Sequence, residues 1–434
     1  MKDEIKTRLA LIRAGKIPEG YKKTKLGIIP QEWEVMPLKS RFDRLTRKNS
    51  EGNTNVMTIS AQYGLINQEE FFKKEIASED KSNYYLMYCG EFAYNKSYSN
   101  GYPFGAIKRL SLYDKGVVSP LYICFSANKD NPCPEFYQHY FEGGKLNSEI
   151  HAIAQEGARN HGLLNISVED FFYTHIIVPH IEEQKKIADI LSAQDKIIEL
   201  CERKIEQLKR MKKYYLQNMF PKGGEEYPEI RFKGFTEPWE QRKLGEVLEI
   251  STHKNGDRYT KEDVLSVSDE FGCVNQIRFQ GRSFAGADIS NYKIVSTGDI
   301  VYTRSPLQAK PFGIIKIVRD EIGVVSPLYI VNKAINGNDA EFIYRVFDLP
   351  YKTNNYLSPL VRKGAKNTMN ISEDEWLSGD IIVSPIYEEQ QTIGAFFKDL
   401  DHLITLHQRK CEEEKKKKKA LQQLLLTGIV RVKK

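Results

Sequence analysis

The hydrophobic pattern is most regular between Ile181 and Met219, where apolar side chains recur every three or four residues. This spacing places them along one face of a single α-helix. Pro179 precedes the segment and Pro221 follows it, so residues that stop helices mark both ends. At about 1.5 Å per residue such a helix would be roughly 55–60 Å long. From Ile198 the apolar steps form a heptad-like seam, which predicts burial against a second helix.

A second segment with the same pattern begins at Ile386. Its opening, IYEEQQTIGAFFKDLDHLI, repeats the opening of the first, IEEQKKIADILSAQDKII. Ile187 corresponds to Ile393 and Asp195 to Asp401, and both pairs lie 206 positions apart. We therefore expect the two helices to pair in antiparallel fashion. The alternative is an ordinary long helix packed on its own domain, which the second copy makes less favoured.

The regions before the two helices also repeat. GVVSPLYICF (116–125) matches GVVSPLYIVN (323–332), and short alternating runs of Val, Ile, Tyr and Phe between Gly and Pro are typical of strands. Helical stretches follow in both copies, around 135–141 and 341–347. The predicted fold class is α+β: two similar globular α/β domains separated by a pair of long antiparallel helices, arranged as a pseudo-twofold dumbbell. The predicted segments are an N-terminal helix packing near the C-terminal helix (1–20), domain 1 (21–179), a central helical spacer (180–222), domain 2 (223–385) and a C-terminal helical spacer (386–434).

Composition narrows the class of protein. The chain has 434 residues, of which 41% are hydrophobic and 28% charged, enough for two or three domains. No run approaches 18 apolar residues, and the opening MKDEIKTRLALIRAGK lacks a signal-peptide core. Six scattered cysteines with no CxxC pair argue against a zinc site and predict a cytoplasmic location. The net charge of +6 permits a nucleic-acid partner without requiring one.

Motifs for catalysis are missing from the sequence. There is no Walker loop, no GxGxxG after a strand, and no HExxH or GxSxG. The run Asn131-Pro-Cys-Pro lacks the aromatic residue of adenine methyltransferase motifs. Glu91 and Lys96 could form a nuclease-like pair, but the second copy has Asp299 and Arg304, and no second carboxylate accompanies either pair. We therefore expect a chain that is not an enzyme and binds no metal or cofactor.

Polar residues at equivalent places in both copies are the candidates for DNA binding. Arg and Lys can bond guanine edges, and Asn and Gln can bond adenine edges, although either kind can contact phosphate instead. A structural use, such as a salt bridge or a capped turn, is left open for each. The divergent segments, 50–85 against 256–293 and 97–102 against 305–310, would suit two surfaces with different targets, or reflect drift in exposed loops. The candidates are Lys48, Asn49, Asn95, Lys96, Ser97, Tyr98, Tyr102, Arg159, Asn160, Lys254, Asn255, Arg258, Arg304, Ser305, Gln308, Lys310, Lys366 and Asn367.

The whole repeat resembles the DNA-specificity subunit of a Type I restriction–modification system. The resemblance is carried by the domain openings LGIIPQEWEVMPL and GFTEPWEQRKLGEV, the two GVVSPLY runs, and the two helical segments quoted above. It implies target-recognition domains that each read half of a bipartite DNA sequence, and helical spacers that fix the separation of the half-sites. It also implies two modification subunits that methylate adenine, and restriction subunits that cleave DNA. S-adenosylmethionine, ATP and Mg²⁺ would be bound by those partners.

Three other interpretations remain open. The chain could be an orphan DNA-binding or regulatory protein on the same scaffold, a self-contained endonuclease, or a coiled-coil scaffold with no nucleic-acid role. Co-purification of a methyltransferase, magnesium-dependent cleavage by the isolated chain, and salt-dependent DNA binding would distinguish them.

Overall fold

The computed structural model describes residues 2–60, 63–72, 80–99, 101–128, 132–154, 164–306, 310–363 and 369–432. The chain divides into two compact units: unit 1 is Met1–Leu200 with Lys410–Lys434, and unit 2 is Cys201–Arg409. Both long helices predicted from the sequence are present, as α6 (Ile181–Asn218) and α11 (Tyr387–Leu425). Each helix begins in one unit and ends in the other.

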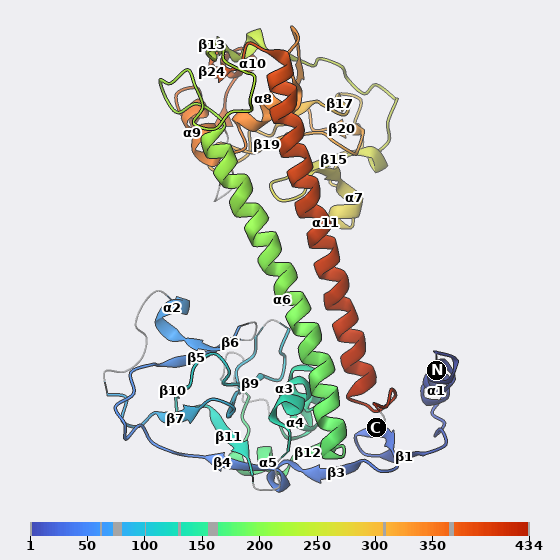
Figure 1. Cartoon of the computed structure of the whole chain (residues 1–434). Helices are drawn as coiled ribbons and strands as arrows, with labels where there is room; N and C mark the ends of the chain where they lie inside the picture. Colours follow the sequence, from blue (N-terminus) through green and yellow to red (C-terminus); the bar gives the residue numbers. More distant parts are fainter. Residues whose placement is uncertain are drawn as a thin grey trace. The chain divides into compact units, whose positions relative to one another are not determined.

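Unit 1 is built on small antiparallel sheets (Figure 1). Its four-stranded sheet has the order β4 (Phe42–Leu45), β11 (Ile123–Ala127), β8 (Phe92–Asn95) and β9 (Ala106–Arg109). Its strand pairs are β1 (Tyr21–Thr24) with β2 (Gly27–Pro30), β3 (Glu34–Pro37) with β12 (His175–Val178), β5 (Met57–Ser60) with β6 (Gly64–Asn67), and β7 (Tyr85–Tyr88) with β10 (Lys115–Val118).

Unit 2 repeats the four-stranded sheet and three of the four strand pairs. Its four-stranded sheet has the order β14 (Leu248–Ile250), β21 (Ile330–Ala334), β18 (Ile300–Tyr302) and β19 (Ile315–Ile317). Its strand pairs are β13 (Glu240–Lys243) with β24 (Asp380–Val383), β15 (Leu265–Ser268) with β16 (Gly272–Asn275), β17 (Lys293–Val295) with β20 (Gly323–Val325), and β22 (Arg362–Lys363) with β23 (Met369–Asn370).

Apart from α1, the shorter helices also correspond between the units, and local sequence sets their ends. Pro134 opens one helix, where its missing N–H costs nothing, and Ser372 with Glu375 forms a capping box at another. Unit 1 contains α1 (Lys2–Arg13), α2 (Gln68–Phe72), α3 (Pro134–Glu142), α4 (Asn147–Ile153) and α5 (Val168–Tyr173). Unit 2 contains α7 (Gln276–Gln280), α8 (Ala340–Val346), α9 (Pro350–Leu357) and α10 (Glu373–Ser378). The 3₁₀ turns are Leu38–Ser40 in unit 1 and Leu244–Glu246 and Lys261–Asp263 in unit 2.

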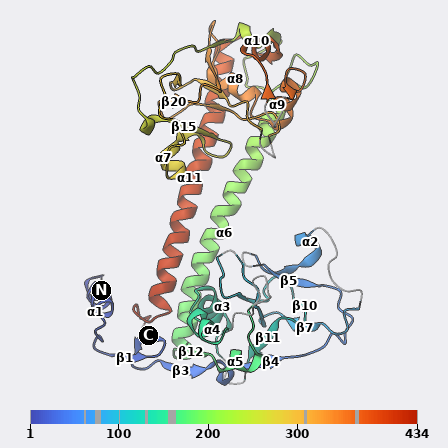
Figure 2. The ribbon, with the colours of Figure 1, turned by 180° about the vertical axis from the view of Figure 1, so that it is seen from behind.

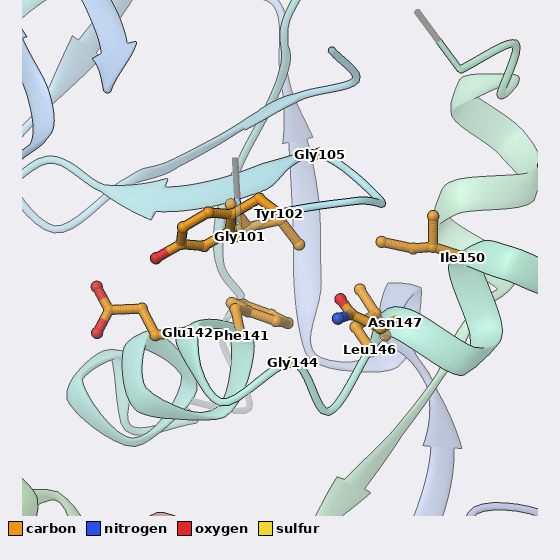
Figure 3. A pocket seen from close by; sticks show the side chains of 10 residues that line it. Gly101, Tyr102, Gly105, Phe141, Glu142, Gly144, Leu146, Asn147 and Ile150 are labelled. Atoms are coloured by element: carbon orange, nitrogen blue, oxygen red, sulfur yellow. The ribbon is translucent and has the colours of Figure 1, made fainter. Parts of the chain in front are cut away.

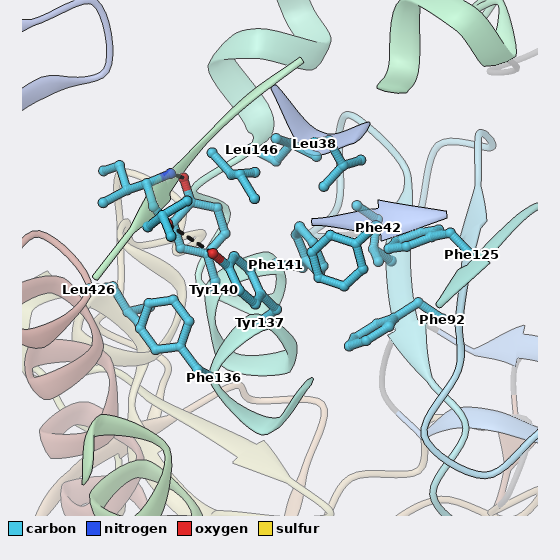
Figure 4. Packing of buried hydrophobic residues seen from close by; sticks show 14 of the residues in the cluster. Leu38, Phe42, Phe92, Phe125, Phe136, Tyr137, Tyr140, Phe141, Leu146 and Leu426 are labelled. Carbon is cyan, nitrogen blue, oxygen red and sulfur yellow. Dashed lines mark hydrogen bonds between the residues drawn. The ribbon is translucent and has the colours of Figure 1, made fainter. Parts of the chain in front are cut away.

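Aromatic side chains fill the core of unit 1 between the four-stranded sheet and α3 (Figure 4). Phe42 contacts Phe92 and Tyr137 edge-on, with ring centroids 5.8 and 5.1 Å apart, the geometry that aromatic pairs prefer. Leu426, just after α11, belongs to the same cluster. In unit 2 the equivalent cluster includes Phe220, just after α6. The end of each long helix therefore completes the core of the unit in which it ends.

In each unit, part of α6 lies beside part of α11 (Figures 1 and 2). In unit 1, Asp195 pairs with Lys418, and the Gln194 amide donates to the carboxylate of Glu414 at 2.5 Å. In unit 2, Leu208 packs with Leu400 and Ile404. In each unit the contacts join earlier residues of one helix to later residues of the other, so the predicted antiparallel pairing of the long helices is confirmed.

The repeated Glu-Glu-Gln motif, in the first turn of each long helix, makes hydrogen bonds to the rest of the unit in which that helix begins. In unit 1, Glu183 accepts a hydrogen bond from the Trp33 indole at 2.8 Å and two from the Arg431 guanidinium at 2.7 and 2.9 Å. Gln184 accepts from the Cys133 backbone N–H at 3.0 Å and donates to the Pro179 carbonyl at 2.8 Å. The motif thus joins the start of α6 to the opening of α3 and to the last residues of the chain.

Unit 2 builds the same arrangement from different parts of the sequence. Glu389 accepts from Trp239 at 3.2 Å and from Arg231 at 2.7 and 2.8 Å. Gln390 accepts from the Asp339 backbone N–H at 2.8 Å and donates to the Ser384 carbonyl at 2.8 Å. Arg231, in the connection after α6, therefore has the role that Arg431, after α11, has in unit 1.

Candidate nucleic-acid interface

The Lys-Asn pair predicted in both copies lies in one kind of loop. Asn49 is buried, accepts from the Asn53 backbone N–H at 2.8 Å and donates to the Asn53 carbonyl at 2.9 Å. Asn255 is buried and makes the same two bonds to Tyr259, at 2.8 and 3.0 Å. Both amides therefore stabilise the loop in which they lie, and neither faces solvent. Lys48 is exposed beside Asn49, with its ammonium donating to the Asn83 carbonyl at 2.9 Å.

Lys254, the equivalent of Lys48, is also exposed, and its ammonium donates to the side-chain oxygen of Asn291 at 3.2 Å. Arg258 is exposed four residues later, with its guanidinium 5.5 Å from the centre of the Tyr259 ring. These cations are available on the surface of their loops. Each suits a phosphate contact, which positions DNA without reading its sequence.

The basic residue after β8 in unit 1 and after β18 in unit 2 makes a hydrogen bond from its own loop to a second loop. The Lys96 ammonium lies 3.4 Å from the Ile166 carbonyl. Arg304 donates to the carbonyl of Ile371, the equivalent residue, at 3.2 Å, and to the Leu328 carbonyl at 2.7 Å. Arg304 has a positive φ of 52°, which costs energy for a residue with a side chain. Both cations are half-buried and use at least one of their hydrogen-bond donors within the protein.

The turn from Asn95 to Tyr102 in unit 1 combines fixed and exposed side chains. The Asn95 side chain accepts from the Ser97 backbone N–H at 3.0 Å, whereas Tyr98 is 60% exposed. Tyr102 lines a pocket of about 170 Å³ together with Glu142 (Figure 3), and Lys108 donates to the Tyr102 hydroxyl at 3.3 Å. The pocket is smaller than the roughly 300 Å³ at which sites for small molecules begin.

The remaining candidates are divided by their environment. Ser305 is exposed. Lys310 and Lys316 both bind Asp269, with ammonium-to-carboxylate distances of 3.2 and 3.3 Å. Burial by itself would raise the pKa of Asp269, but the positive charges of the two lysines outweigh this effect. The pKa therefore lies below its ordinary value. Arg159, Asn160, Gln308, Lys366 and Asn367 lie outside the described residues.

In the described parts of the chain, no group of three or more His, Cys, Asp or Glu side chains is placed to hold a metal ion. In the same ranges, no helix combines the length and apolar character needed to cross a membrane.

The sequence analysis singled out the divergent segments 50–85 and 256–293 as possible target surfaces. It did not predict the hairpins β5–β6 and β15–β16 within them, or the one-turn helices α2 and α7 that follow. These elements expose the aromatic side chains of Tyr63, Phe271 and Phe279. The spacing of the repeat was a signal that could have identified them, because Tyr63 and Phe271 lie 208 positions apart, the same offset as the central strands.

Comparisons with known proteins agree with the duplicated fold. The family model for the Type I restriction modification DNA specificity domain matches twice, at residues 30–210 and 236–415. A protein of Methanocaldococcus jannaschii, provisionally described as the type I restriction enzyme MjaX specificity subunit, is 26% identical over 96% of this chain and 97% of its own length. The MjaVIII specificity subunit from the same organism is 28% identical over 63% of this chain and 66% of its own.

Two solved structures share the fold. The S subunit of a Type-I restriction-modification system from M. genitalium has a TM-score of 0.54 at 13% identity, covering 91% of this chain and 96% of that one. A chain from a study of complex assembly and conformational transition of the type I R-M system has a TM-score of 0.51 at 14% identity, covering 93% and 99%. With both halves matched by the family model, this chain belongs to the DNA specificity subunits of Type I restriction–modification systems, the non-catalytic components of those systems.

Proposed function

We propose that each unit reads one half of a bipartite duplex DNA target, and that the chain thereby directs adenine methylation and restriction by partner subunits. One observation carries the proposal: the two units share a topology and a set of buried hydrogen bonds but differ in the exposed residues of equivalent loops. A common scaffold with different surfaces suits two different half-sites.

The reactive groups of the complex would belong to other chains. Two methyltransferase subunits would bind S-adenosylmethionine, and restriction subunits would bind ATP and Mg²⁺. The exposed cations Lys48, Lys254 and Arg258 would contact phosphates and set the position of each unit on the duplex. The complex would act in the cytoplasm, on the cell's own DNA and on incoming DNA.

The test is to map methylated adenines in cells that carry the complete system. We expect a single bipartite motif. Replacing residues 30–178 with the corresponding segment of another such subunit should change the bases of one half-site and leave the other unchanged. A change in both half-sites, or methylation without a bipartite motif, would contradict the proposal. If the chain binds DNA but no methyltransferase co-purifies with it, the orphan regulatory protein becomes the better explanation.

A further inference from the structure

Each unit presents an exposed pair of aromatic side chains on the same two elements. In unit 1, Tyr63 lies in the turn of the β5–β6 hairpin and Phe71 lies on α2, with exposed fractions of 65% and 43%. In unit 2, Phe271 lies in the turn of β15–β16 and Phe279 lies on α7, with exposed fractions of 59% and 44%. Large apolar side chains that are exposed at equivalent places in two copies contribute little to the core, so their place in the fold points to a binding role.

The backbone holds both pairs in the same way. The Tyr63 N–H donates to the Ser60 hydroxyl at 3.2 Å, and the Phe271 N–H donates to the Ser268 hydroxyl at 3.2 Å. The next turn is fixed by an asparagine that caps the one-turn helix. The backbone N–H of residue 70 donates to the side chain of Asn67 at 3.1 Å, and that of residue 278 donates to Asn275 at 3.0 Å.

In unit 2 the two rings also meet, with centroids 5.5 Å apart. Just beyond α7, the Arg282 guanidinium lies 4.6 Å from the centre of the Phe284 ring, and Phe284 is 58% exposed. The Phe284 N–H donates to the Gln276 side chain at 2.7 Å. Unit 2 therefore displays three exposed rings and a cation on the hairpin turn, on α7 and on the segment just after α7.

The polar neighbours of the rings are opposite in charge. Glu70 on α2 and Arg278 on α7 occupy equivalent positions, 208 residues apart. Glu70 accepts a hydrogen bond from the Tyr113 hydroxyl at 3.3 Å. Arg278 pairs with Glu321 at 3.2 Å while its side chain stays 75% exposed, so this pair is weak enough to exchange. If each unit bound a copy of the same partner protein, the two copies would meet opposite charges at this position. Two half-sites of different DNA sequence can differ in the same way, with one suited to Glu70 and the other to Arg278.

We propose that these hairpin–helix elements, residues 57–60 and 63–72 in unit 1 and 265–284 in unit 2, carry the base-reading surfaces of the two units. The proposal deepens the proposed function and rests on it. The aromatic pairs pack against base edges, thymine methyl groups or an opened base step. Glu70 accepts a hydrogen bond from the amino group of a cytosine, and Arg278 donates to O6 and N7 of a guanine.

The experiment uses the full chain co-purified with its methyltransferase subunits, and DNA duplexes that carry the motif identified by methylome sequencing. Arg278→Gln should reduce the preference for guanine at one position of one half-site by roughly fivefold or more. The other half-site should keep its preferences. Arg210→Gln is the matched control, because Arg210 is also 75% exposed and ion-paired, on α6; it should leave every base preference unchanged.

A second variant tests the rings. Phe271→Ala with Phe279→Ala should weaken binding to the identified duplex while the complex still assembles, because both side chains are exposed. Tyr227→Ala, at an exposed tyrosine (52%) in a connection of unit 2, should leave binding unchanged. If the wild-type complex yields a bipartite motif but Arg278→Gln and the double Phe variant bind and discriminate like the wild type, the assignment of these surfaces is wrong. If the double variant loses the methyltransferase instead, the surface is a protein interface. If the wild type yields no bipartite motif, the proposed function itself fails.

Discussion

Among single residues, His139 and Arg345 occupy equivalent positions in the two units but differ in charge. They lie 206 positions apart, on α3 and α8. Arg345 is 1% exposed and binds Asp348 and Asp401 at 2.7 and 2.8 Å, so it is charged at every accessible pH. His139 is 2% exposed, and its Nε2 lies 3.1 Å from the Ser192 hydroxyl. Burial lowers the pKa of His139 below its ordinary value of 6.5.

This difference predicts a loss of stability toward acidic pH that arises at His139 in unit 1 and has no counterpart at Arg345 in unit 2. With its folded-state pKa below 6.5, His139 binds a proton more readily in the unfolded chain. The stability that the neutral imidazole contributes is therefore complete above about pH 6.5 and is lost as the pH falls below that value. The charged groups around the imidazole are Asp195 on α6, Lys418 on α11, and Glu135 and Glu142 on α3.

Hydrogen exchange can measure the effect within one molecule. Between pH 7.5 and 5.5, protection of α3 should fall relative to α8, after correction for intrinsic exchange, because Arg345 does not titrate. His139→Gln should remove the difference between the two helices. Equal losses of protection in α3 and α8 of the wild type would show that His139 does not cause the effect.

Among the elements, the two long helices are shared: each begins in one unit and ends in the other. Residues after α11 complete unit 1, where the Tyr21 hydroxyl donates to the Gly428 carbonyl at 2.7 Å and Arg8 donates to the Ile429 carbonyl. Gly428 has a φ of 69°, and a Cβ at this position would lie 2.4 Å from the Pro30 ring. Only glycine fits this turn. The N-terminal helix α1 thus contacts the segment that follows the C-terminal helix.

The two equivalent arginines provide a matched pair of variants. Arg431→Ala should destabilise unit 1 and leave unit 2 unchanged, although residue 431 lies at the far end of the sequence. Arg231→Ala should destabilise unit 2 alone. Each change leaves a buried glutamate without its cation, which costs about 3–5 kcal/mol for a fully buried pair and less for Arg431, which is partly exposed.

Urea titration followed by limited proteolysis would show which unit opens first in each variant. Arg210→Ala, which removes an exposed i,i+4 pair on α6, should change stability by about 0.5 kcal/mol or less. If Arg431→Ala destabilises unit 2 as much as unit 1, the C-terminal segment does not act locally.

At the scale of the whole molecule, duplication has preserved the buried framework more strictly than the surface. Tyr94 and Tyr302 illustrate the framework. Each donates its hydroxyl hydrogen to the carbonyl of a phenylalanine ten residues later, at 2.8 and 2.7 Å. Each also stacks on an aromatic ring of a later helix, Phe171 of α5 and Trp376 of α10, with centroids 5.0 and 4.8 Å apart. Exposed side chains beside the hairpins, such as Glu70 on α2 and Arg278 on α7, carry no such constraint and could diverge.

If the long helices set the distance between half-sites, deleting one heptad from each should shorten the spacer in the DNA target. Removing residues 198–204 from α6 and 407–413 from α11 takes about 10 Å from each helix, or roughly three base pairs of DNA. The bases of both half-sites should stay the same. Methylome sequencing of cells carrying the shortened subunit measures both quantities, and altered base identities with an unchanged spacer would exclude this role of the helices.

The two long helices and the duplication could be predicted from the sequence alone. Helical periodicity identified both ends of α6 and the start of α11 to within about one residue, because a long apolar stripe has one local solution. The end of α11 at Leu425 comes before the end of the predicted C-terminal spacer at residue 434. Offsets near 206 predicted two domains of like fold, and the resemblance of both halves to known specificity subunits predicted the family. These features depend on neighbouring residues or on matches along the chain, so they can be read without coordinates.

The three-dimensional structure was needed to see which polar side chains make hydrogen bonds inside the protein. Asn49, Asn255, Lys96 and Arg304 have the residue types of base readers, yet their hydrogen bonds are made to backbone carbonyls within the protein. The exposed aromatic pairs, and the closure of unit 1 by Arg431, depend on contacts between residues far apart in the sequence. Whether a polar group is satisfied inside the fold or left for a partner depends on the three-dimensional arrangement of its neighbours, which spacing along the chain does not specify.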